Sequence, residues 1–366
     1  MNIVFILPSL EKIAPVTVLV NIINFLVKQE NVKVQIITLQ HTPKNNYKNE
    51  LLEKGITIYE YLSLKDAYKD KNSTFWNSID ILHINSLKPN ILAYLLQKKY
   101  RHLKSLVTIH SVEKVDYVQS RGFLKGSFGY RLNALLCKKR DKVVAVSLDV
   151  LEYLKSMNIT NSMLIHNGIN FEGFKVYPNV QKSQNSIELV QVGILNINKN
   201  QFYSLRLLKN LLKKGLKVKL HLLGGVKDDN YKNKLDSYIV QHKLEESVLF
   251  YGNVEVSRLT EILSTKDILL MPSYSEGLPL SPLEGYFYEL PAITSKNGGL
   301  KEVNIEGKTG ILIDIEDESS FKKVELFIRS GEYIEVSKNV KHFVEEFFSA
   351  ELMAKSYYKL YNSLLK

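Results

Sequence analysis

Residues 268–284 read ILLMPSYSEGLPLSPLE: a short apolar run, a loop rich in Gly and Pro, and the start of an apolar helix. A buried strand that leads through a loop into a helix is the repeating unit of a parallel α/β sheet. The loop carries Glu276, and Glu284 follows in the first helical turn. Loop amides and helix N-termini favour anions, whereas carboxylates accept hydroxyl hydrogens. The stretch therefore suits a ligand that carries both phosphate and sugar hydroxyls.

The same alternation of apolar runs and helical patterns continues along nearly the whole chain. It predicts parallel sheets that have helices on both faces. In the first half the predicted strands are residues 2–7, 33–39, 79–84, 105–109, 142–146 and 162–166, with helices at 15–29, 88–99 and 148–156. In the second half the predicted strands are residues 187–192, 217–223, 247–251, 267–271 and 291–294.

The chain has 366 residues, which is too long for one ordinary hydrophobic core. A polar segment at residues 171–186 interrupts the alternation and predicts a linker. We expect one Rossmann-like domain over residues 1–170 and a second over residues 187–349, with a helix at 350–366 packing back on the first domain. We expect two such sheets to face one another across a central cleft between their carboxyl ends. The carboxyl ends of the strands are where open α/β sheets bind ligands.

The composition excludes several classes of protein. With 45% hydrophobic and 24% charged residues the chain is neither disordered nor fibrous, and one cysteine excludes a disulfide framework and a Cys-based zinc site. The absence of an Asp-x-Asp or His-rich ligand set predicts that no metal takes part. The apolar start runs into Pro8 without a basic leader, so we expect a first strand and a cytoplasmic protein.

Positive charge is concentrated in the first half of the chain. Residues 1–170 hold 23 Lys and Arg against 13 Asp and Glu, whereas residues 171–366 hold 26 against 25. This asymmetry predicts that the first half faces an anionic lipid surface or a nucleic acid, although no nucleic-acid motif is present. A solvated helix face is the open alternative. The densest part lies within residues 121–142 and contains Arg121, Lys125, Arg131, Lys138, Lys139, Arg140 and Lys142.

The Glu276-x7-Glu284 spacing resembles the signature of retaining glycosyltransferases of family 4, which have the GT-B fold. Further segments that resemble the family follow the signature or lie in the first half of the chain. They occur in the same order as in the family. They are LPAITS at 290–295, Gly298-Gly299, Glu302-Val303, GKTG at 307–310, VAVS at 144–147 and IHNGIN at 165–170. The resemblance spans nearly the whole chain.

The resemblance implies that Glu284 binds the ribose hydroxyls of a nucleotide and that Glu276 contacts the donor sugar. Lys199 matches the lysine that holds the diphosphate, where a fixed ammonium stabilises the charge that grows on the leaving group. His110 matches a histidine that contacts the donor sugar. The implied catalytic residues are therefore Glu276, Lys199 and His110, and the implied donor-binding residues are Glu284, Gly277, Leu278, Pro279, Leu280, Asn253 and Val254.

Structural roles remain open for some of these residues. Ser281-x-x-Glu284 with Pro282 between them matches a helix capping box, in which Glu284 would only cap. Lys199 could be a surface lysine at a helix start, and His110 could cap a strand edge. For His83 and His166 the strand-edge role is the better interpretation.

Two departures from the family pattern stand out. Ile194 occupies the position where the family usually has a second diphosphate-binding arginine, and the first loop, residues 9–15, lacks the usual glycine pair. The missing arginine favours a catalytically weak or inert GT-B partner subunit as an alternative function, and a GT-B sugar-nucleotide epimerase is another.

The main hypothesis is a retaining, metal-independent hexosyltransferase that needs no cofactor beyond its donor. It would move a sugar from a nucleotide sugar, with UDP as the expected nucleotide, to an acceptor hydroxyl. The acceptor would be a lipid-linked or growing surface glycan, and the protein would work in the cytoplasm, peripherally at the inner face of the cell membrane.

Overall fold

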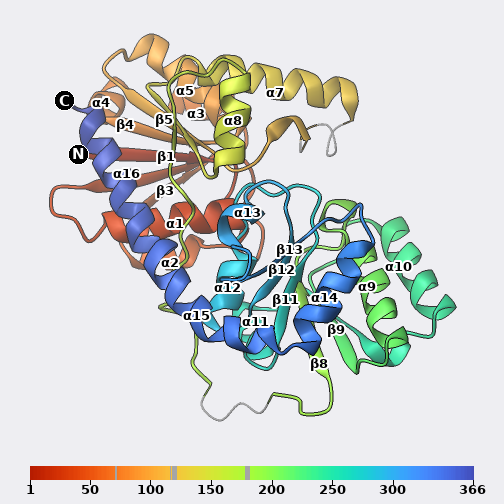
Figure 1. Ribbon diagram of the computed structural model, residues 1–366. Coiled ribbons are helices and arrows are strands. Elements are labelled where there is room, and N and C mark those ends of the chain that lie inside the picture. Colours follow the sequence, from red (N-terminus) through yellow and green to blue (C-terminus); the bar gives the residue numbers. More distant parts are fainter. Residues whose placement is uncertain (71, 116, 118–121, 178–181) are drawn as a thin grey trace. The chain divides into compact units, whose positions relative to one another are not determined.

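The computed structural model describes residues 1–70, 72–115, 117, 122–177 and 182–366 (Figure 1). These residues form two compact units, and each unit has its own parallel sheet. The first unit combines Met1–Ile169 with Ser349–Lys366, and the second unit holds Asn170–Phe348. The predicted α/β class, with two Rossmann-like domains, is confirmed by these two sheets.

Within its described residues the first unit has a seven-stranded sheet in the order β3-β2-β1-β4-β5-β6-β7. The strands are β1 (Asn2–Leu7), β2 (Lys33–Thr38), β3 (Thr57–Glu60), β4 (Ile81–Asn85), β5 (Lys104–Ile109), β6 (Lys142–Ala145) and β7 (Ser162–Leu164). The helices are α1 (Ala14–Leu26), α2 (Lys48–Glu53), α3 (Leu64–Asp70), α4 (Ser73–Asn77), α5 (Leu87–Lys99), α7 (Phe123–Cys137), α8 (Leu148–Ser156) and α16 (Ala350–Leu364).

The sheet of the first unit is covered on both faces. The chain moves in opposite directions from β1 to β2 and from β4 to β5, so right-handed crossovers place α1 and α5 on opposite faces. Every residue of β4 and all but the first of β1 are buried, as expected for central strands that helices cover on both sides.

The C-terminal helix α16 belongs to the first unit and packs beside α1 (Figure 1). Its Tyr361 hydroxyl lies 2.6 Å from Nδ1 of His83 in β4, whose Nε2 lies 2.8 Å from the Thr108 hydroxyl. Tyr357, also in α16, completes the network at 3.0 Å from Thr108. Burial lowers the pKa of His83 to about 3, so its imidazole is neutral. His83 therefore has a structural role inside β4 and does not cap a strand edge.

Within its described residues the second unit has a six-stranded sheet in the order β10-β9-β8-β11-β12-β13. The strands are β8 (Ile187–Val192), β9 (Val218–Leu223), β10 (Val248–Gly252), β11 (Ile268–Met271), β12 (Ala292–Ser295) and β13 (Gly310–Ile313). The α-helices are α9 (Gln201–Lys213), α10 (Asp229–Gln241), α11 (Val256–Ser264), α12 (Ser281–Phe287), α13 (Leu300–Val303), α14 (Ser319–Arg329) and α15 (Glu332–Phe347). Two short 3-10 helices complete the unit: η1 (Ile197–Lys199) and η2 (Glu245–Ser247).

The segment predicted as a polar linker, residues 171–186, is tied to the second unit by aromatic contacts. The Phe171 ring stacks on Phe287 with 4.8 Å between centroids, and Phe174 packs edge-on against the same ring. The Tyr177 hydroxyl donates to the carbonyl of Ser257 at 3.2 Å. Residues 178–181 of this segment lie outside the described part of the chain.

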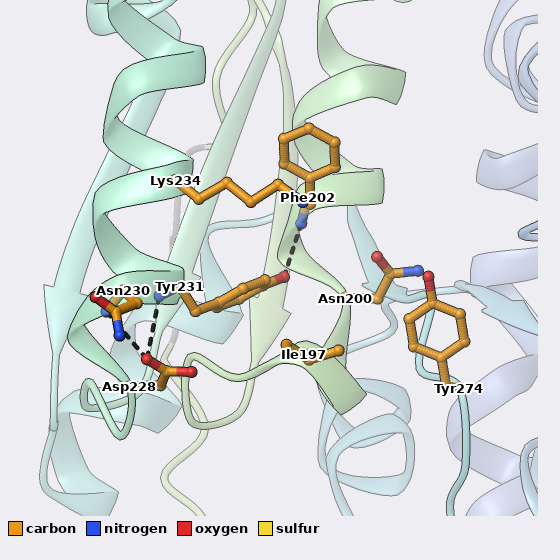
Figure 2. A pocket seen from close by; sticks show the side chains of 8 residues that line it. All are labelled: Ile197, Asn200, Phe202, Asp228, Asn230, Tyr231, Lys234 and Tyr274. Carbon is orange, nitrogen blue, oxygen red and sulfur yellow. Dashed lines mark hydrogen bonds between the residues drawn. The ribbon is translucent and has the colours of Figure 1, made fainter.

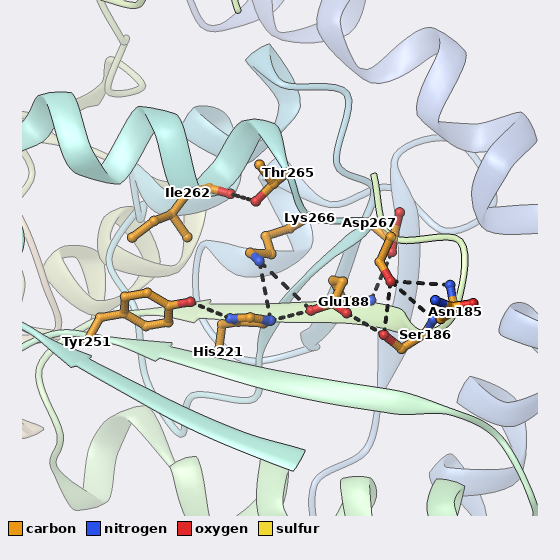
Figure 3. Close-up of polar contacts among 10 residues, drawn as sticks. Asn185, Ser186, Glu188, His221, Tyr251, Ile262, Thr265, Lys266 and Asp267 are labelled. Carbon is orange, nitrogen blue, oxygen red and sulfur yellow. Dashed lines mark hydrogen bonds and ion pairs between the residues drawn. The ribbon is translucent and has the colours of Figure 1, made fainter. Parts of the chain in front are cut away.

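A buried polar cluster joins β8, β9 and the turn before β11 at the amino end of β8 (Figure 3). The Glu188 carboxylate contacts Nε2 of His221 and lies 3.9 Å from the Lys266 ammonium. The Tyr251 hydroxyl bonds to Nδ1 of His221 at 2.9 Å. Burial raises the pKa of Glu188, but hydrogen bonds from Ser186 and His221 outweigh it and hold the pKa below its usual value. The cluster lies away from the carboxyl edge of the sheet, so its role is structural.

Glu188→Ala is expected to lower the free energy of unfolding by about 3 kcal/mol, because it leaves the buried Lys266 ammonium without its carboxylate. Urea unfolding followed by circular dichroism measures the change. Glu246→Ala, which removes an exposed carboxylate from the same unit, is the matched control and should change the stability little. Equal midpoints for the two variants would contradict a stabilising role for the cluster.

Candidate active site

The candidate site lies at the carboxyl edge of the second sheet, where the strand order reverses. β8 lies between β9 and β11, so the loops that leave β8 and β11 meet at this reversal. Open α/β sheets bind ligands at such a point. The two loops are residues 193–200, which contain η1, and residues 272–280, which contain the EGLPL sequence.

The loop after β11 is held on one side by the loop after β8. The Asn198 amide donates to the carbonyl of Ser275 at 2.8 Å, and the backbone N–H of Tyr274 donates to the carbonyl of Asn198 at 2.9 Å. Asn200 adds a bond to the carbonyl of Pro272 at 3.2 Å. These bonds fix the position of Glu276 relative to η1.

The glycine pair Gly298-Gly299 holds the same loop on its other side. The N–H of Gly299 donates to the carbonyl of Glu276 at 3.0 Å. A Cβ on Gly298 would lie 2.2 Å from the Glu276 carbonyl oxygen, and one on Gly299 would lie 1.9 Å from the carbonyl oxygen of Gly277. Gly298 also has a φ of +60°, which favours glycine. No side chain fits between the two loops, and this close approach explains the glycine pair in the sequence.

Lys199 and Glu276 form an ion pair across the two loops. The Nζ of Lys199 lies 2.7 Å from Oε1 of Glu276, and both side chains are largely shielded from solvent. The backbone of Lys199 is fixed by Asn196, which accepts from its N–H at 2.8 Å, and by Gln191, which donates to its carbonyl at 2.6 Å. An ammonium carries three N–H donors, so two remain for an anion beside Glu276.

Glu284 does not cap its helix. α12 begins at Ser281 with Leu280 as the N-cap residue, and no side chain makes a capping bond there. The capping-box interpretation of Ser281-x-x-Glu284 is therefore wrong. Burial raises the pKa of the Glu284 carboxyl to about 7. Within the described residues, no hydrogen bond or ion pair to this carboxyl was found, so its oxygens can accept from a ligand.

The four residues that follow Glu276 lead the loop into α12. Gly277, Leu278, Pro279 and Leu280 are all buried. α12 has only seven residues, so its dipole favours an anion at its N-terminus less than the dipole of a longer helix would.

Asn253 and Val254 follow β10 at the neighbouring edge of the sheet. The Asn253 side chain is exposed and packs against Gly225, where a Cβ would lie 2.6 Å from its Oδ1. Gly225 thus allows the loops after β9 and β10 to approach each other. Gly224, where a Cβ would lie 2.1 Å from the carbonyl oxygen of Gly193, allows the same approach to the loop after β8.

His110 lies in the first unit, directly after β5, whereas Lys199, Glu276 and Glu284 lie in the second unit. Burial lowers the pKa of His110 to about 4, so its ring is neutral. Its buried Nε2 has no hydrogen-bond partner among the described residues. A neutral imidazole nitrogen in this state can bond to a ligand hydroxyl.

Ile194 leaves the loop after β8 with one cation fewer than the family pattern. Its side chain is 43% exposed, and its carbonyl accepts from Gln201 at 3.1 Å. Among the residues that the structure describes in the two loops, Lys199 is the one that pairs with a glutamate of the signature.

A cavity of about 320 Å³ adjoins the loop after β8 on the side of α9 and α10 (Figure 2). The Tyr231 hydroxyl accepts from the N–H of Phe202 at 3.1 Å, and Asp228 caps α10. Lys199, Glu276 and Glu284 do not line it. No local sequence pattern predicts this cavity, because its walls come from segments that are separate in the chain. It is lined by Ile197, Asn200, Phe202, Asp228, Asn230, Tyr231, Lys234 and Tyr274.

Family models match both halves of the chain. The model described as Glycosyltransferase Family 4 matches residues 16–172, and the model described as Glycosyl transferases group 1 matches residues 176–343. The second match contains Lys199, Glu276 and Glu284, and the first contains His110.

Relatives match the chain over nearly its full length at low identity. The O-antigen biosynthesis glycosyltransferase WclY of Escherichia coli is 23% identical over 376 residues, which cover 100% of this chain and 99% of WclY. The capsular polysaccharide biosynthesis glycosyltransferase CapM of Staphylococcus aureus is 22% identical over 382 residues, which cover 94% of this chain and 93% of CapM.

Solved structures share the fold. HepE of Anabaena, in a complex with UDP, has a TM-score of 0.82 at 15% identity and covers 99% of this chain and 100% of its own. Sucrose-phosphate synthase from Thermosynechococcus elongatus has a TM-score of 0.78 at 17% identity, with coverage of 99% and 98%. At these identities the likeness concerns the fold alone.

Proposed function

We propose that this chain, which belongs to the GT-B glycosyltransferases of the family 4 type, moves a sugar from a nucleotide sugar to an acceptor hydroxyl with retention of configuration. The observation that carries the proposal is the Lys199–Glu276 pair at the strand-order reversal, with Glu284, to which no described residue makes a hydrogen bond or ion pair, in the same loop-helix segment. A cation, a sugar-binding carboxylate and a free carboxyl suit the diphosphate, the sugar and the ribose of such a donor.

UDP is the nucleotide that we propose for the donor. HepE, which has the same fold, was solved in complexes with UDP and with UDP-glucose. In this chain Glu284 would accept hydrogen bonds from both ribose hydroxyls, while the exposed Asn253 and the half-buried Val254 would lie beside the base. Gly277 to Leu280 would line the sugar and the diphosphate.

The proposed reaction needs no cofactor besides its donor and no nucleophile from the protein. The bond between the anomeric carbon and the diphosphate oxygen breaks, and the nucleoside diphosphate leaves with the electron pair. The acceptor oxygen attacks the anomeric carbon on the same face, and its proton passes to the departing diphosphate. Lys199 stabilises the charge that grows on that leaving group. Glu276 and His110 would hold the hydroxyls of the donor sugar.

A surface glycan or its lipid-linked precursor is the acceptor that we propose. WclY and CapM, whose names place them in O-antigen and capsular polysaccharide biosynthesis, match nearly the whole chain. Within the described residues no helix is long and apolar enough to cross a membrane.

The test measures nucleoside diphosphate release from a panel of UDP-, dTDP-, GDP- and ADP-sugars, with and without a polyprenyl-diphosphate-linked monosaccharide as acceptor probe. A transferase releases the diphosphate in proportion to the acceptor consumed. An epimerase would change the donor without consuming acceptor, and an inert partner subunit would bind the donor without release. Either of these outcomes would overturn the proposal.

Ile194→Arg is expected to tighten binding of the nucleotide sugar by about fivefold or more, because it supplies a second cation for the diphosphate. Calorimetric titration with the donor that the panel selects measures the effect. Ile197→Arg is the matched control, since Ile197 is exposed in the same loop but lines the cavity beside α10. An equal gain in both variants would show that only the added net charge matters.

A further inference from the structure

Helix α7 of the first unit exposes large apolar side chains on its outward face. Its other face, which includes Gly126, Gly129, Ala134 and Cys137, is buried. A surface helix of a water-exposed protein normally turns charged or polar residues outward. The exposed side chains and their exposed fractions are Phe123 at 74%, Leu124 at 82%, Phe128 at 71% and Leu135 at 60%.

Three of these side chains form one continuous stripe. Leu124, Phe128 and Leu135 are separated by four and seven residues, so they lie above one another on a helix of 3.6 residues per turn. Phe123 adds an aromatic ring at the first helical residue. We call these four side chains the apolar stripe of α7.

Cations border the apolar stripe on both sides. The helical period places Arg131 along one border and Lys125 along the other, and Lys138 and Lys139 follow directly after the last helical residue. All four side chains are exposed. Residues 122–140 contain no acidic residue. Long basic side chains beside an apolar stripe can keep their charges at a polar boundary while their stems cover apolar surface.

Arg140 does not belong to this surface, although it lies in the basic run of the sequence. Its side chain is buried, with Nε donating to the carbonyl of Leu136 at 3.2 Å and an Nη donating to Gln97 at 2.7 Å. The expectation that Arg140 would face an anionic partner is therefore wrong. Arg121 lies outside the described residues.

We propose that α7 lies flat in the interface of an anionic lipid bilayer, with the apolar stripe in the acyl boundary and its bordering cations at the headgroups. This arrangement is typical of helices that lie in a membrane interface. A second copy of the chain fits the face poorly, because a two-fold contact would set the cations of one α7 against those of the other. The proposal rests on α7 and does not depend on the transfer reaction.

The proposal goes beyond attraction between a basic surface and anionic lipid. Attraction alone predicts binding that disappears as salt screens the charges. Insertion of the stripe predicts an additional part of the binding that persists at high salt and requires the apolar side chains. It would also bring the first unit to the surface where a lipid-linked acceptor resides.

The first experiment is co-sedimentation of the full chain with vesicles of phosphatidylglycerol and phosphatidylcholine, at low and high salt. The triple variant Leu124→Ser, Phe128→Ser, Leu135→Ser is expected to lower the partition coefficient at least about tenfold. The matched control is Val240→Ser with Leu326→Ser, which removes exposed apolar side chains from helices of the second unit. Partition of the triple variant equal to that of the control would overturn the proposal.

The second experiment reports insertion directly. The chain has one tryptophan, Trp76, which is buried, so Phe128→Trp adds a probe whose emission can be isolated by difference. The emission of the added tryptophan should shift to shorter wavelength when anionic vesicles are added. Without vesicles its wavelength should not change. Binding without a shift, or a dimer of the free chain that the triple variant abolishes, would overturn the proposal.

Discussion

Lys199→Met should lower the turnover of sugar transfer by about 100-fold or more, the largest effect that we expect from a single substitution. The diphosphate gains charge as the glycosidic bond breaks, and a fixed cation stabilises that charge more in the transition state than in the ground state. Methionine keeps an apolar stem. In Lys199 this stem packs over Gly193, where a Cβ added to the glycine would lie 3.2 Å from the lysine Cδ. The substitution therefore removes the charge and leaves most of the packing.

The measurement is the rate of acceptor-dependent nucleoside diphosphate release at saturating donor. Lys213→Met is the matched control, because Lys213 is an exposed lysine at the other end of α9 and should leave the rate unchanged. Circular dichroism checks that the variant is folded. Glu276→Ala is expected to cause a similar loss, since it removes the partner of Lys199 and the proposed contact with the sugar. Full activity in both variants would refute the site.

Glu284→Gln should weaken binding of the nucleotide sugar by roughly 1–3 kcal/mol, which is about 5- to 150-fold in the dissociation constant. A carboxylate accepts hydrogen bonds from both ribose hydroxyls, whereas a carboxamide loses one acceptor and the charge. Because no side chain caps α12, the substitution removes no helix cap. Calorimetric titration at pH 8 measures the loss.

The pH dependence of the wild-type protein gives a second test of Glu284. Its pKa of about 7 in the free protein means that the ionised form becomes populated as the pH rises from 6 to 8. This ionised form is the one that would accept hydrogen bonds from both ribose hydroxyls of the donor. Affinity for the donor should therefore increase about tenfold from pH 6 to pH 8 and level off above that range. The diphosphate of a nucleotide sugar is esterified at both ends and does not titrate here.

The Glu284→Gln variant should bind the donor with a flat pH profile over this range. His110 cannot produce the wild-type slope, because its pKa of about 4 keeps it neutral from pH 6 to pH 8. An unchanged slope in the variant would assign the titration to another group. Equal affinities of wild type and variant at pH 8 would exclude Glu284 from donor binding.

The sequence predicts the central sheets well because their strands are buried on both sides. Runs such as residues 3–7 and 268–271 carry the continuous apolar signal that is typical of helix-covered parallel strands. β3 and β13 were not predicted. β3 reads TIYE at the edge of its sheet and has no buried residue, so it carries little apolar pattern. β13 reads GILI and is mostly buried, but so short an apolar run does not distinguish a strand from a buried turn of helix.

The site is only partly predictable, because its key distances join residues far apart in the chain. Local patterns place Glu276 after one strand and Lys199 after another, but the 2.7 Å pair depends on the bonds that Asn198 and Asn200 make to the loop after β11. The opposite error occurs at Arg140. Its place in a basic run suggested exposure, whereas its guanidinium turns back onto α7 and Gln97.

The most direct test of the account is the anomeric configuration of the product, read by nuclear magnetic resonance from a reaction of donor, acceptor probe and wild-type protein. We expect one new glycosidic bond between the donor sugar and the acceptor, with the anomeric configuration that the sugar had in the donor, together with one nucleoside diphosphate. An inverted product would contradict the same-face mechanism that Lys199 serves. An acceptor left unchanged, with the donor intact or epimerised, would contradict sugar transfer itself.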